Sequence, residues 1–227
     1  MISHQKILSA SILSADSSCL RDECQSIIES GADWIHVDVM DGQFVPQITW
    51  GPKVIKDLKS SCAGIVIDAH IMVQNPDFSS YIEAGCDRIT FHPSTVSDPL
   101  KSLELLKRSG CIAGFAISPH ENLCDFPLDF WHRFDFVLLM SVHPGKAGQT
   151  FLSQSIDRLY WIKKHYPRMI VSIDGGIHKE TIGHVRDADI FVAGSALFSK
   201  ESLEIKSRGP FYKKSIETIR QALKYSA

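Results

Sequence analysis

The sequence predicts an α/β protein of the (β/α)₈ TIM-barrel class. Apolar runs rich in β-branched residues alternate with stretches of helical periodicity along the whole chain. Polar residues gather at the ends of nearly all these runs, where barrel enzymes carry their active sites. The length of 227 residues suits one such barrel. We therefore expect residues 1–227 to form a single (β/α)₈ domain.

Eight apolar runs are expected to be strands. In chain order they are residues 6–12, 33–39, 64–70, 87–92, 111–117, 134–142, 168–173 and 189–194. The first run faintly resembles the core of a signal peptide. It is short, interrupted by serines and preceded by no basic segment, so a first strand is the better interpretation.

Amphipathic stretches between these runs predict helices. Leu20, Cys24, Ile27 and Ile28 fall on one helical face, and Gly31 can end that helix. The matching positions later in the chain are Leu100, Leu103, Leu106 and Lys107 before a stop at Gly110, and then Phe211, Ile216, Ile219 and Leu223 of a closing helix. A doubly wound open sheet is the main structural alternative. It would be favoured by five or six strands and a glycine-rich first turn, whereas residues 11–16 (SILSAD) contain no glycine.

Composition excludes several classes of function. The formal net charge is −2 and no run of Lys or Arg stands out, so nothing indicates binding to nucleic acid or to a membrane surface. No apolar run approaches the ~20 residues that a membrane-spanning helix needs. The six cysteines form no CxxC pair and lie in apolar stretches, which suits buried residues in a reducing compartment. We expect a cytoplasmic protein whose assembly into a homo-oligomer is left open.

Polar residues at the ends of the expected strands supply the candidate site. They are Ser11, His36, Asp38, Asp41, His70, His92, Ser141, Asp174, Gly194 and Ser195. Because the carboxyl ends of all barrel strands meet at one face, these residues should converge there.

Four of these residues predict a metal site. His36 and Asp38 alternate along one strand and so share a face, while His70 and Asp174 would project from two other strands. Two imidazoles and two carboxylates suit Zn²⁺, Fe²⁺, Mn²⁺ or Co²⁺, and ligand type alone does not choose among these ions. The alternative is that the histidines are core residues and the aspartates only hold loops. Asp68 shares a face with His70 and is a weaker ligand candidate, better suited to support a ligand.

Three glycine-bearing turns predict a phosphate site. They comprise Gly145, Lys146, Ala147 and Gly148 after the sixth strand, Gly175 and Gly176 after the seventh, and Gly194 and Ser195 after the eighth. Glycine lets the backbone approach a ligand closely, and barrels of this kind commonly hold phosphate with the loops after strands seven and eight. Met40, Met72 and Met140 also lie at strand ends, either filling the core or keeping water from a reactive intermediate.

These groups together suit proton abstraction next to a carbonyl. A divalent cation would balance the charge that develops on the ketone oxygen, and a phosphate site would anchor the substrate. One carboxylate removes the α-proton, and a second on the opposite face returns a proton with inverted configuration. This arrangement predicts an epimerase.

The chain resembles the ribulose-phosphate 3-epimerase family. The matching motifs are SILSAD at residues 11–16, GADWIHVDVMDGQFVP at 31–46, DAHIMV at 68–73, MSVHPGKAGQ at 140–149, IDGG at 173–176 and AGS at 193–195. They occur in order across about residues 6–200.

The resemblance implies interconversion of D-ribulose 5-phosphate and D-xylulose 5-phosphate in the pentose phosphate pathway. It implies Asp38 as the proton acceptor and Asp174 as the proton donor, both also binding one divalent metal ion with His36 and His70. It further implies that Ser11 and His70 contact the ketose phosphate. By the same resemblance, the turns at 145–148, 175–176 and 194–195 hold its phosphate.

The chain departs from the family pattern at three places. Residues 143–148 read HPGKAG where the family usually has a sequence close to NPGFGG, so Lys146 replaces a bulky Phe. Ala10 stands where a Pro usually precedes the serine, and residues 117–121 read ISPHE where NPGT is common. These differences concern the packing of a lid and the fit of substrate, not the reaction class.

Three other functions compete with this interpretation. A 3-epimerase acting on a six-carbon ketose phosphate such as allulose 6-phosphate would differ only in pocket length. A related decarboxylase barrel would carry Asp-x-Lys-x-x-Asp on the third strand, but residues 68–73 have no lysine. A non-catalytic sugar-phosphate-binding barrel would not need all four metal ligands.

Overall fold

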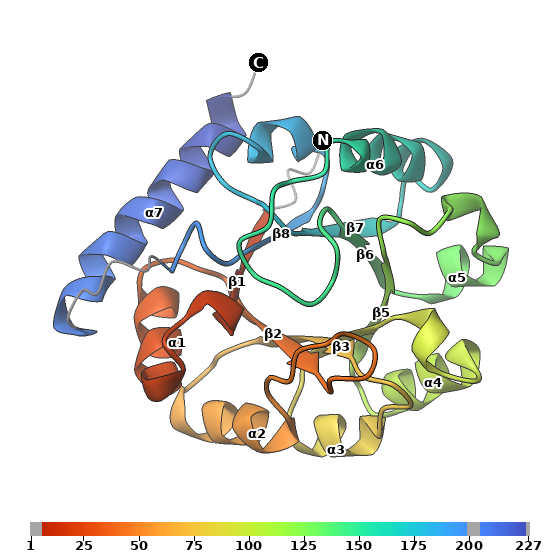
Figure 1. Ribbon diagram of the computed structural model, residues 1–227, viewed down its shortest axis with the longest axis horizontal. Coiled ribbons are helices and arrows are strands. Elements are labelled where there is room, and N and C mark those ends of the chain that lie inside the picture. The colour runs from red at the N-terminus through yellow and green to blue at the C-terminus, as the bar shows by residue number, and fades with distance from the viewer. Residues whose placement is uncertain (1–5, 199–204, 226–227) are drawn as a thin grey trace.

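The computed structural model describes residues 6–198 and 205–225, and their strands close into a parallel barrel (Figure 1). The strands are β1 (Ile7–Ser11), β2 (Trp34–Met40), β3 (Ile67–Met72), β4 (Arg88–Phe91), β5 (Ile112–Ile117), β6 (Phe136–Met140), β7 (Ile170–Asp174) and β8 (Ile190–Ala193). Each strand pairs with the next in the chain, and β8 pairs with β1. The predicted barrel is confirmed, and the open sheet is wrong. The third strand begins later than expected, because Gly64 turns the chain with a φ of 74°.

Helices surround the barrel (Figure 1). They are α1 (Leu20–Glu29), α2 (Pro52–Ser61), α3 (Phe78–Glu83), α4 (Pro99–Arg108), α5 (Leu128–Arg133), α6 (Gln154–His165) and α7 (Ile205–Tyr225). Short 3₁₀ turns are η1 (Ile12–Ser14), η2 (Ser17–Cys19), η3 (Pro93–Thr95), η4 (Leu123–Asp125) and η5 (Ile182–Val185). The expectation of a helix after each strand needs one correction. Between β7 and β8 the chain forms only η5, because its 15 residues also carry the glycine turn that follows β7.

The helices bury the faces that their periodicity indicates. Cys24 and Ile27 of α1 are buried, and the closing helix α7 buries Ile216 and Ile219 while it packs beside α1. Asp98 begins α4, since its side chain accepts a 3.0 Å hydrogen bond from the backbone N–H of Lys101.

The prediction that the cysteines are buried is confirmed for only some of them. Four are buried, but Cys19 is half-buried and Cys124 is exposed, because each lies in a short 3₁₀ turn at the surface.

The barrel interior contains charge as well as apolar side chains. The buried Arg88 guanidinium lies 4.5 Å from the ring centre of Trp34 and 3.9 Å from that of Phe136. Its Nε lies 3.3 Å from a carboxylate oxygen of Asp68. Gly114 makes room for the Phe136 ring, which would lie 2.4 Å from a Cβ at that position. This filled layer forms the floor beneath the strand ends.

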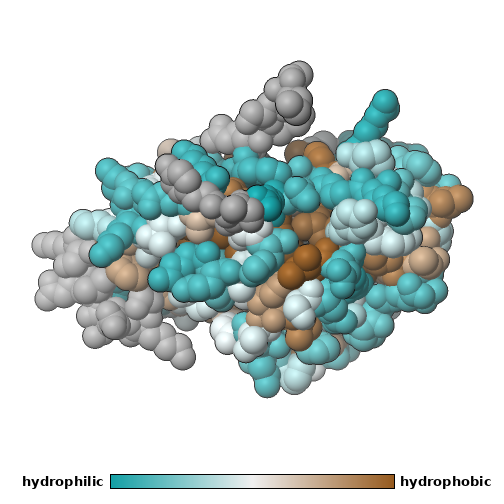
Figure 2. Space-filling model, turned by 90° about the horizontal axis from the view of Figure 1, so that it is seen from above, coloured by the Kyte–Doolittle hydropathy of each residue, from teal (hydrophilic) through white to brown (hydrophobic). Residues whose placement is uncertain are grey.

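Hydrophilic residues cover much of the side of the molecule that Figure 2 shows, with hydrophobic residues visible in smaller areas between them. The exposed large hydrophobic residues are Ile48, Leu105, Ile112, Leu128, Tyr160 and Ile170. Among the described residues, none of the helices combines the length and the hydropathy needed to cross a membrane.

Candidate metal centre and phosphate site

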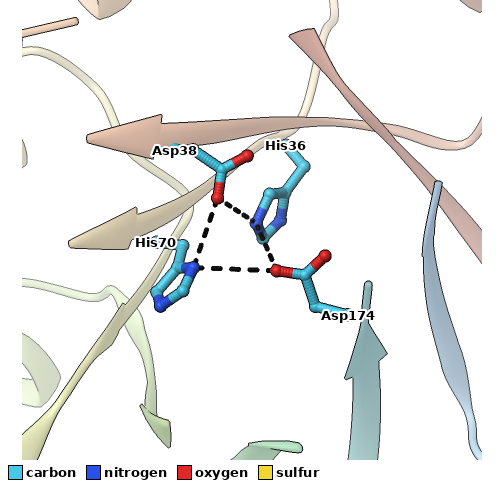
Figure 3. A group of neighbouring side chains, drawn as sticks. All are labelled: His36, Asp38, His70 and Asp174. Carbon is cyan, nitrogen blue, oxygen red and sulfur yellow. Dashed lines mark hydrogen bonds and ion pairs between the residues drawn. The ribbon is translucent and has the colours of Figure 1, made fainter. Parts of the chain in front are cut away.

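Strand register brings the four predicted metal ligands together. His36 and Asp38 point to the same side of β2, and the pairing of β2 with β3 sets Asp38 directly beside His70. Asp174 ends β7, so its carboxylate approaches from the other side of the barrel (Figure 3). One ligand atom of each residue lies within 4.8 Å of all the others.

The nitrogen and oxygen atoms converge on one small space (Figure 3). His36 Nε2 lies 3.5 Å from Oδ1 of Asp38 and 3.9 Å from Oδ2 of Asp174. His70 Nδ1 lies 3.3 Å and 3.8 Å from the same two oxygen atoms. Two ring nitrogens and two carboxylate oxygens thus face each other from three strands.

The convergence fits a divalent cation. His36 Nε2 is buried and has no hydrogen-bond partner among the described residues, although it faces the two carboxylates. Two carboxylates sharing a buried site repel each other unless positive charge lies between them. Imidazole nitrogen with carboxylate oxygen is a donor set that first-row divalent metals accept. The residues present therefore fit a metal ion.

The two aspartates differ in their electrostatic surroundings. Burial alone would raise the pKa of Asp38, but His36 and His70 beside it hold that pKa well below the usual range. Burial, followed by the negative charge of Asp38, raises the pKa of Asp174 to about 6. Burial opposes protonation of His36, yet Asp38 and Asp68 together raise its pKa well above the ordinary value. The site thus brings together ionisable groups that are buried and poorly screened by solvent.

Asp68 supports His36 from below. Its Oδ2 lies 2.9 Å from Nδ1 of His36, while its Oδ1 faces Arg88 at 3.3 Å and Ser9 donates to Oδ2 at 3.4 Å. Because an ionised carboxylate can only accept, it orients the His36 ring with Nδ1–H outward and Nε2 toward the metal ligands. Asp68 lies in the position of a supporting group, not among the four converging ligand atoms.

Asp41 does not join this cluster, although it lies at the same strand end. One of its oxygen atoms accepts from the backbone N–H of Gln43 and Phe44, and the other from that of Gln74. Its place one residue beyond β2 turns the side chain toward the loops. Ser141 also stays outside the cluster: its hydroxyl oxygen lies 2.8 Å and 2.6 Å from the carbonyl oxygens of Asp174 and Gly175, between which its one proton is shared.

The candidate substrate residues line one cavity above the metal ligands, with a volume of about 520 Å³ including its open mouth. Its lining includes Ser11, Gly145, Lys146, Ala147, Gly148, Gly175, Gly176, Gly194 and Ser195, together with Asp38 and Asp174. The predicted carboxylates and the three predicted turns therefore share one space. His70 lies just below it, in contact with Asp38.

Close packing of the loops accounts for the glycines. A Cβ at Gly175 would lie 2.3 Å from a methyl group of Val142, and one at Gly176 would lie 2.8 Å from the backbone nitrogen of Phe151. A Cβ at Gly145 would lie 3.0 Å from Val45, which follows β2. These glycines let three loops meet over the barrel mouth, where the loop after β6 lies across the centre in Figure 1.

The methionines border the same space. Met40, Met72 and Met140 are all buried and line the cavity at the ends of β2, β3 and β6. Their positions are compatible with both expected roles, because the side chains fill the core and also form apolar wall beside the carboxylates.

Sequence reasoning gave no role to two neighbours of the site. His92 follows β4, is fully buried and places its Nε2 2.9 Å from Nε2 of His70. Burial, and then the nearby His70, lower the pKa of His92 well below its ordinary value. Gln149 donates to the carbonyl oxygens of His143 and Lys146 and so braces the loop after β6. The strand-end position of His92 was the available signal, whereas Gln149 gave none.

Comparison with known proteins bears on this site. The family model described as "Ribulose-phosphate 3 epimerase family" matches residues 7–198. A protein of Buchnera aphidicola named ribulose-phosphate 3-epimerase is 38% identical over 201 residues, covering 84% of this chain and 87% of its own length. The protein of that name from Escherichia coli K12 is 37% identical over 232 aligned positions, covering 96% of each chain.

Solved structures show the same fold at low sequence identity. The tryptophan synthase α subunit of Legionella pneumophila superposes with a TM-score of 0.63 at 13% identity, covering 97% of this chain and 93% of its own. At that identity the likeness concerns the barrel alone.

Proposed function

This chain belongs to the ribulose-phosphate 3-epimerase family, and on that premise we propose that its two facing aspartates invert the configuration at C3 of a ketose phosphate. The reaction is the interconversion of D-ribulose 5-phosphate and D-xylulose 5-phosphate, an isomerisation. The observation that carries the proposal is the approach of Asp38 and Asp174 from β2 and β7, below a cavity lined by three glycine turns.

Asp38 acts as the base on ribulose 5-phosphate. Its carboxylate takes the proton from C3, and the electron pair of the C–H bond passes into the neighbouring carbonyl to give an enediolate. Ser11 donates a 2.7 Å hydrogen bond to Oδ2 of Asp38, which orients the carboxylate. Asp174 then gives a proton to the opposite face of C3, so the configuration inverts. The roles exchange in the reverse direction, since the same two groups serve both faces.

His36, Asp38, His70 and Asp174 would hold one divalent cation. When bound, that cation supplies the positive charge that balances the negative charge developing on the substrate oxygen atoms. The donor set accepts Zn²⁺, Fe²⁺, Mn²⁺ or Co²⁺. Asp68 keeps His36 in the tautomer that offers its Nε2 lone pair inward.

The three glycine turns hold the phosphate. Residues 145–148, 175–176 and 194–195 line the cavity on one side, and backbone N–H groups in such turns bind a dianion without side chains. Lys146 is exposed on the lining of this cavity and brings a mobile positive charge to it. Met40, Met72 and Met140 form apolar wall that keeps water from the enediolate.

The test measures turnover of five-carbon and six-carbon ketose phosphates by the same enzyme preparation. We expect D-ribulose 5-phosphate to give the higher kcat/KM, with D-xylulose 5-phosphate as product. Preference for allulose 6-phosphate would instead make the chain a six-carbon 3-epimerase with the same chemistry. Absence of turnover on both substrates with metal bound would contradict the proposal.

Three wider expectations accompany this function. We propose that the whole chain is one catalytic domain, since the family model matches residues 7–198 and α7 packs on α1. Six free cysteines support a reducing cytoplasmic setting, and the substrate supports a place in the pentose phosphate pathway. Assembly into a homo-oligomer is left to measurement.

A further inference from the structure

The two nitrogens of His70 face different partners. Nδ1 lies among the metal ligands, 3.3 Å from Oδ1 of Asp38. Nε2 points away from them and lies 2.9 Å from Nε2 of His92. Both rings are fully buried. When two ring nitrogens meet at hydrogen-bonding distance, one must carry a proton and the other must offer a lone pair.

The second nitrogen of His92 has its own partner. Nδ1 of His92 lies 3.3 Å from Oγ of Ser118, which follows β5. A hydroxyl group can donate or accept, so Ser118 is compatible with either tautomer of His92. The chain His70–His92–Ser118 therefore has two self-consistent arrangements of its hydrogen bonds.

In one arrangement, Nε2–H of His70 donates to His92, and Nδ1–H of His92 donates to Ser118. Nδ1 of His70 then has a free lone pair toward Asp38 and Asp174. In the other, every hydrogen bond runs in reverse, and Nδ1–H of His70 donates to Asp38. Both arrangements contain the same number of protons, so exchange between them requires none to be gained or lost.

We propose that His92 is a positioning residue that accepts the Nε2–H of His70 and so frees Nδ1 of His70 to bind the divalent cation. The inference rests on the proposed function, because it concerns the same metal centre. Only the first arrangement can bind a cation, since the second places a proton where the cation would lie.

The surroundings hold the His92 ring in place for this role. Its ring centre lies 5.1 Å from that of His70 and 4.6 Å from that of Phe44, which comes from the loop after β2. His92 begins the η3 turn directly after β4, so its backbone is fixed by the barrel. Contacts with these two rings and the barrel backbone thus restrict the position of Nε2.

His36 shows why this arrangement matters for His70. The partner of His36 Nδ1 is the carboxylate of Asp68, which is paired with Arg88. Ionised Asp68 accepts and cannot donate, so Nδ1 of His36 carries a proton in every state and Nε2 is the nitrogen that faces the metal site. His92 can do either. Binding of the cation therefore requires no change of ring orientation at His36, but it favours one of the two tautomers of His70.

The experiment compares two substitutions of His92 with one control. His92→Leu removes the hydrogen-bond acceptor and replaces the ring with an apolar side chain of similar volume. His92→Gln keeps an acceptor oxygen near the position of Nε2. Thr90→Val is the control, because Thr90 pairs with His70 across β3 and β4 and its buried hydroxyl has no hydrogen-bond partner among the described residues.

Metal-free forms of the full-length protein are titrated with Co²⁺ and with Zn²⁺, and the visible absorption of bound Co²⁺ reports the ligand geometry. We expect His92→Leu to bind Co²⁺ about 10–100-fold more weakly than wild type, as loss of such a supporting group usually does. His92→Gln should recover most of the affinity, and Thr90→Val should match wild type in both affinity and spectrum.

Equal Co²⁺ affinity in His92→Leu and wild type would overturn the inference. So would equal weakening in both His92 variants accompanied by the same loss of thermal stability in their metal-free forms, because that result indicates packing alone. If wild-type protein binds neither ion, the proposed metal centre itself fails, which is a distinct result.

Imidazole NMR keeps the inference testable if His92→Leu does not fold. In wild-type protein loaded with Zn²⁺, ¹⁵N–¹H spectra should show His92 protonated at Nδ1 and unprotonated at Nε2, with its signals identified by their loss in His92→Gln. A proton on Nε2 of His92 in that state would overturn the inference.

Discussion

The hydroxyl group of Ser11, at the end of β1, donates a 2.7 Å hydrogen bond to Oδ2 of Asp38, two residues before the end of β2. The bond joins the neighbouring strands β1 and β2 and fixes the orientation of the Asp38 carboxylate. A hydrogen bond to a charged group contributes ~1.5–3 kcal/mol.

Ser11→Ala should therefore lower kcat/KM by about 10–100-fold, as 1.4 kcal/mol corresponds to a factor of ten. Ser9→Ala is the control, because Ser9 lies on the same strand and makes only a 3.4 Å bond to Asp68. Steady-state kinetics of both variants decide the matter. Equal losses in the two variants would show that the bond to Asp38 has no special role.

Loss of either facing carboxylate should nearly abolish epimerisation. Asp38→Asn and Asp174→Asn should each lower kcat by at least ~10³-fold, since general acid–base catalysis contributes 10²–10⁴ and metal binding weakens as well. One variant can still exchange the C3 proton with solvent without inverting the centre, because only one face is served. Deuterium incorporation in heavy water, followed by NMR, separates exchange from inversion. Near-normal epimerisation by either variant would assign the proton transfers elsewhere.

Removal of the metal should stop turnover while the barrel stays folded. The continuous apolar core between strands and helices does not depend on the four ligands. Chelated protein should keep its far-ultraviolet circular dichroism and regain activity when one equivalent of a divalent ion returns. Metal content is measured in parallel. Full activity in protein shown to contain no metal would contradict the mechanism.

The barrel and part of the candidate ligand set were predictable because they follow from local periodicity. Alternation along β2 places His36 and Asp38 on one face, whichever strand lies beside it. The pairing of Asp38 with His70 depends on register between strands, which neither strand encodes alone. The convergence was predictable only because strand ends meet in a barrel.

Other features depend on loop conformation and could not be predicted. Asp41 resembles a site residue by position, but the turn after β2 directs it to backbone N–H groups. For His92 the sequence indicated only a polar residue at a strand end. Its contact with His70 depends on the pairing of β3 with β4. The short η5 replaced an expected helix because the glycine turn after β7 takes up part of the connection between β7 and β8.

Gly175→Ala should destabilise the fold and disturb the site together. Gly175 has a φ of 116°, and a Cβ there would lie 2.3 Å from Val142. Backbone strain and overpacking each cost about 1–3 kcal/mol, so we expect a loss of about 2–6 kcal/mol in urea unfolding.

Gly64→Ala is the matched control, because its φ of 74° is also positive but a Cβ there would meet nothing within 4 Å. Its cost should stay at about 1–2 kcal/mol, the strain of the left-handed backbone alone. Adding Val142→Ala to Gly175→Ala should restore part of the cost of the clash, because it removes the methyl groups at 2.3 Å and 2.7 Å but leaves the Val142 Cβ at 2.9 Å. Equal destabilisation by the two glycine substitutions would show that contact with Val142 is unimportant.

Lys146 should strengthen binding of the substrate phosphate. It lies exposed in a loop that is held at its base by Gly145 against Val45 and braced by Gln149. An ammonium group cannot seal a pocket as the Phe usual in this family would, because burying an unpaired charge costs more than its apolar stem recovers. The side chain can instead bring its charge to the mouth of the cavity, which it lines.

Lys146→Ala should raise KM about threefold to tenfold and leave kcat nearly unchanged, because the charge helps to bind substrate and transition state alike. The effect should shrink at high salt, since an exposed charge is screened. Lys101→Ala, in an exposed position on the outer helix α4, is the control and should change neither constant. Steady-state kinetics at low and at high ionic strength test both variants. If KM of Lys146→Ala matches wild type at low ionic strength, Lys146 is an ordinary solvated residue, and the glycine turns alone bind the phosphate.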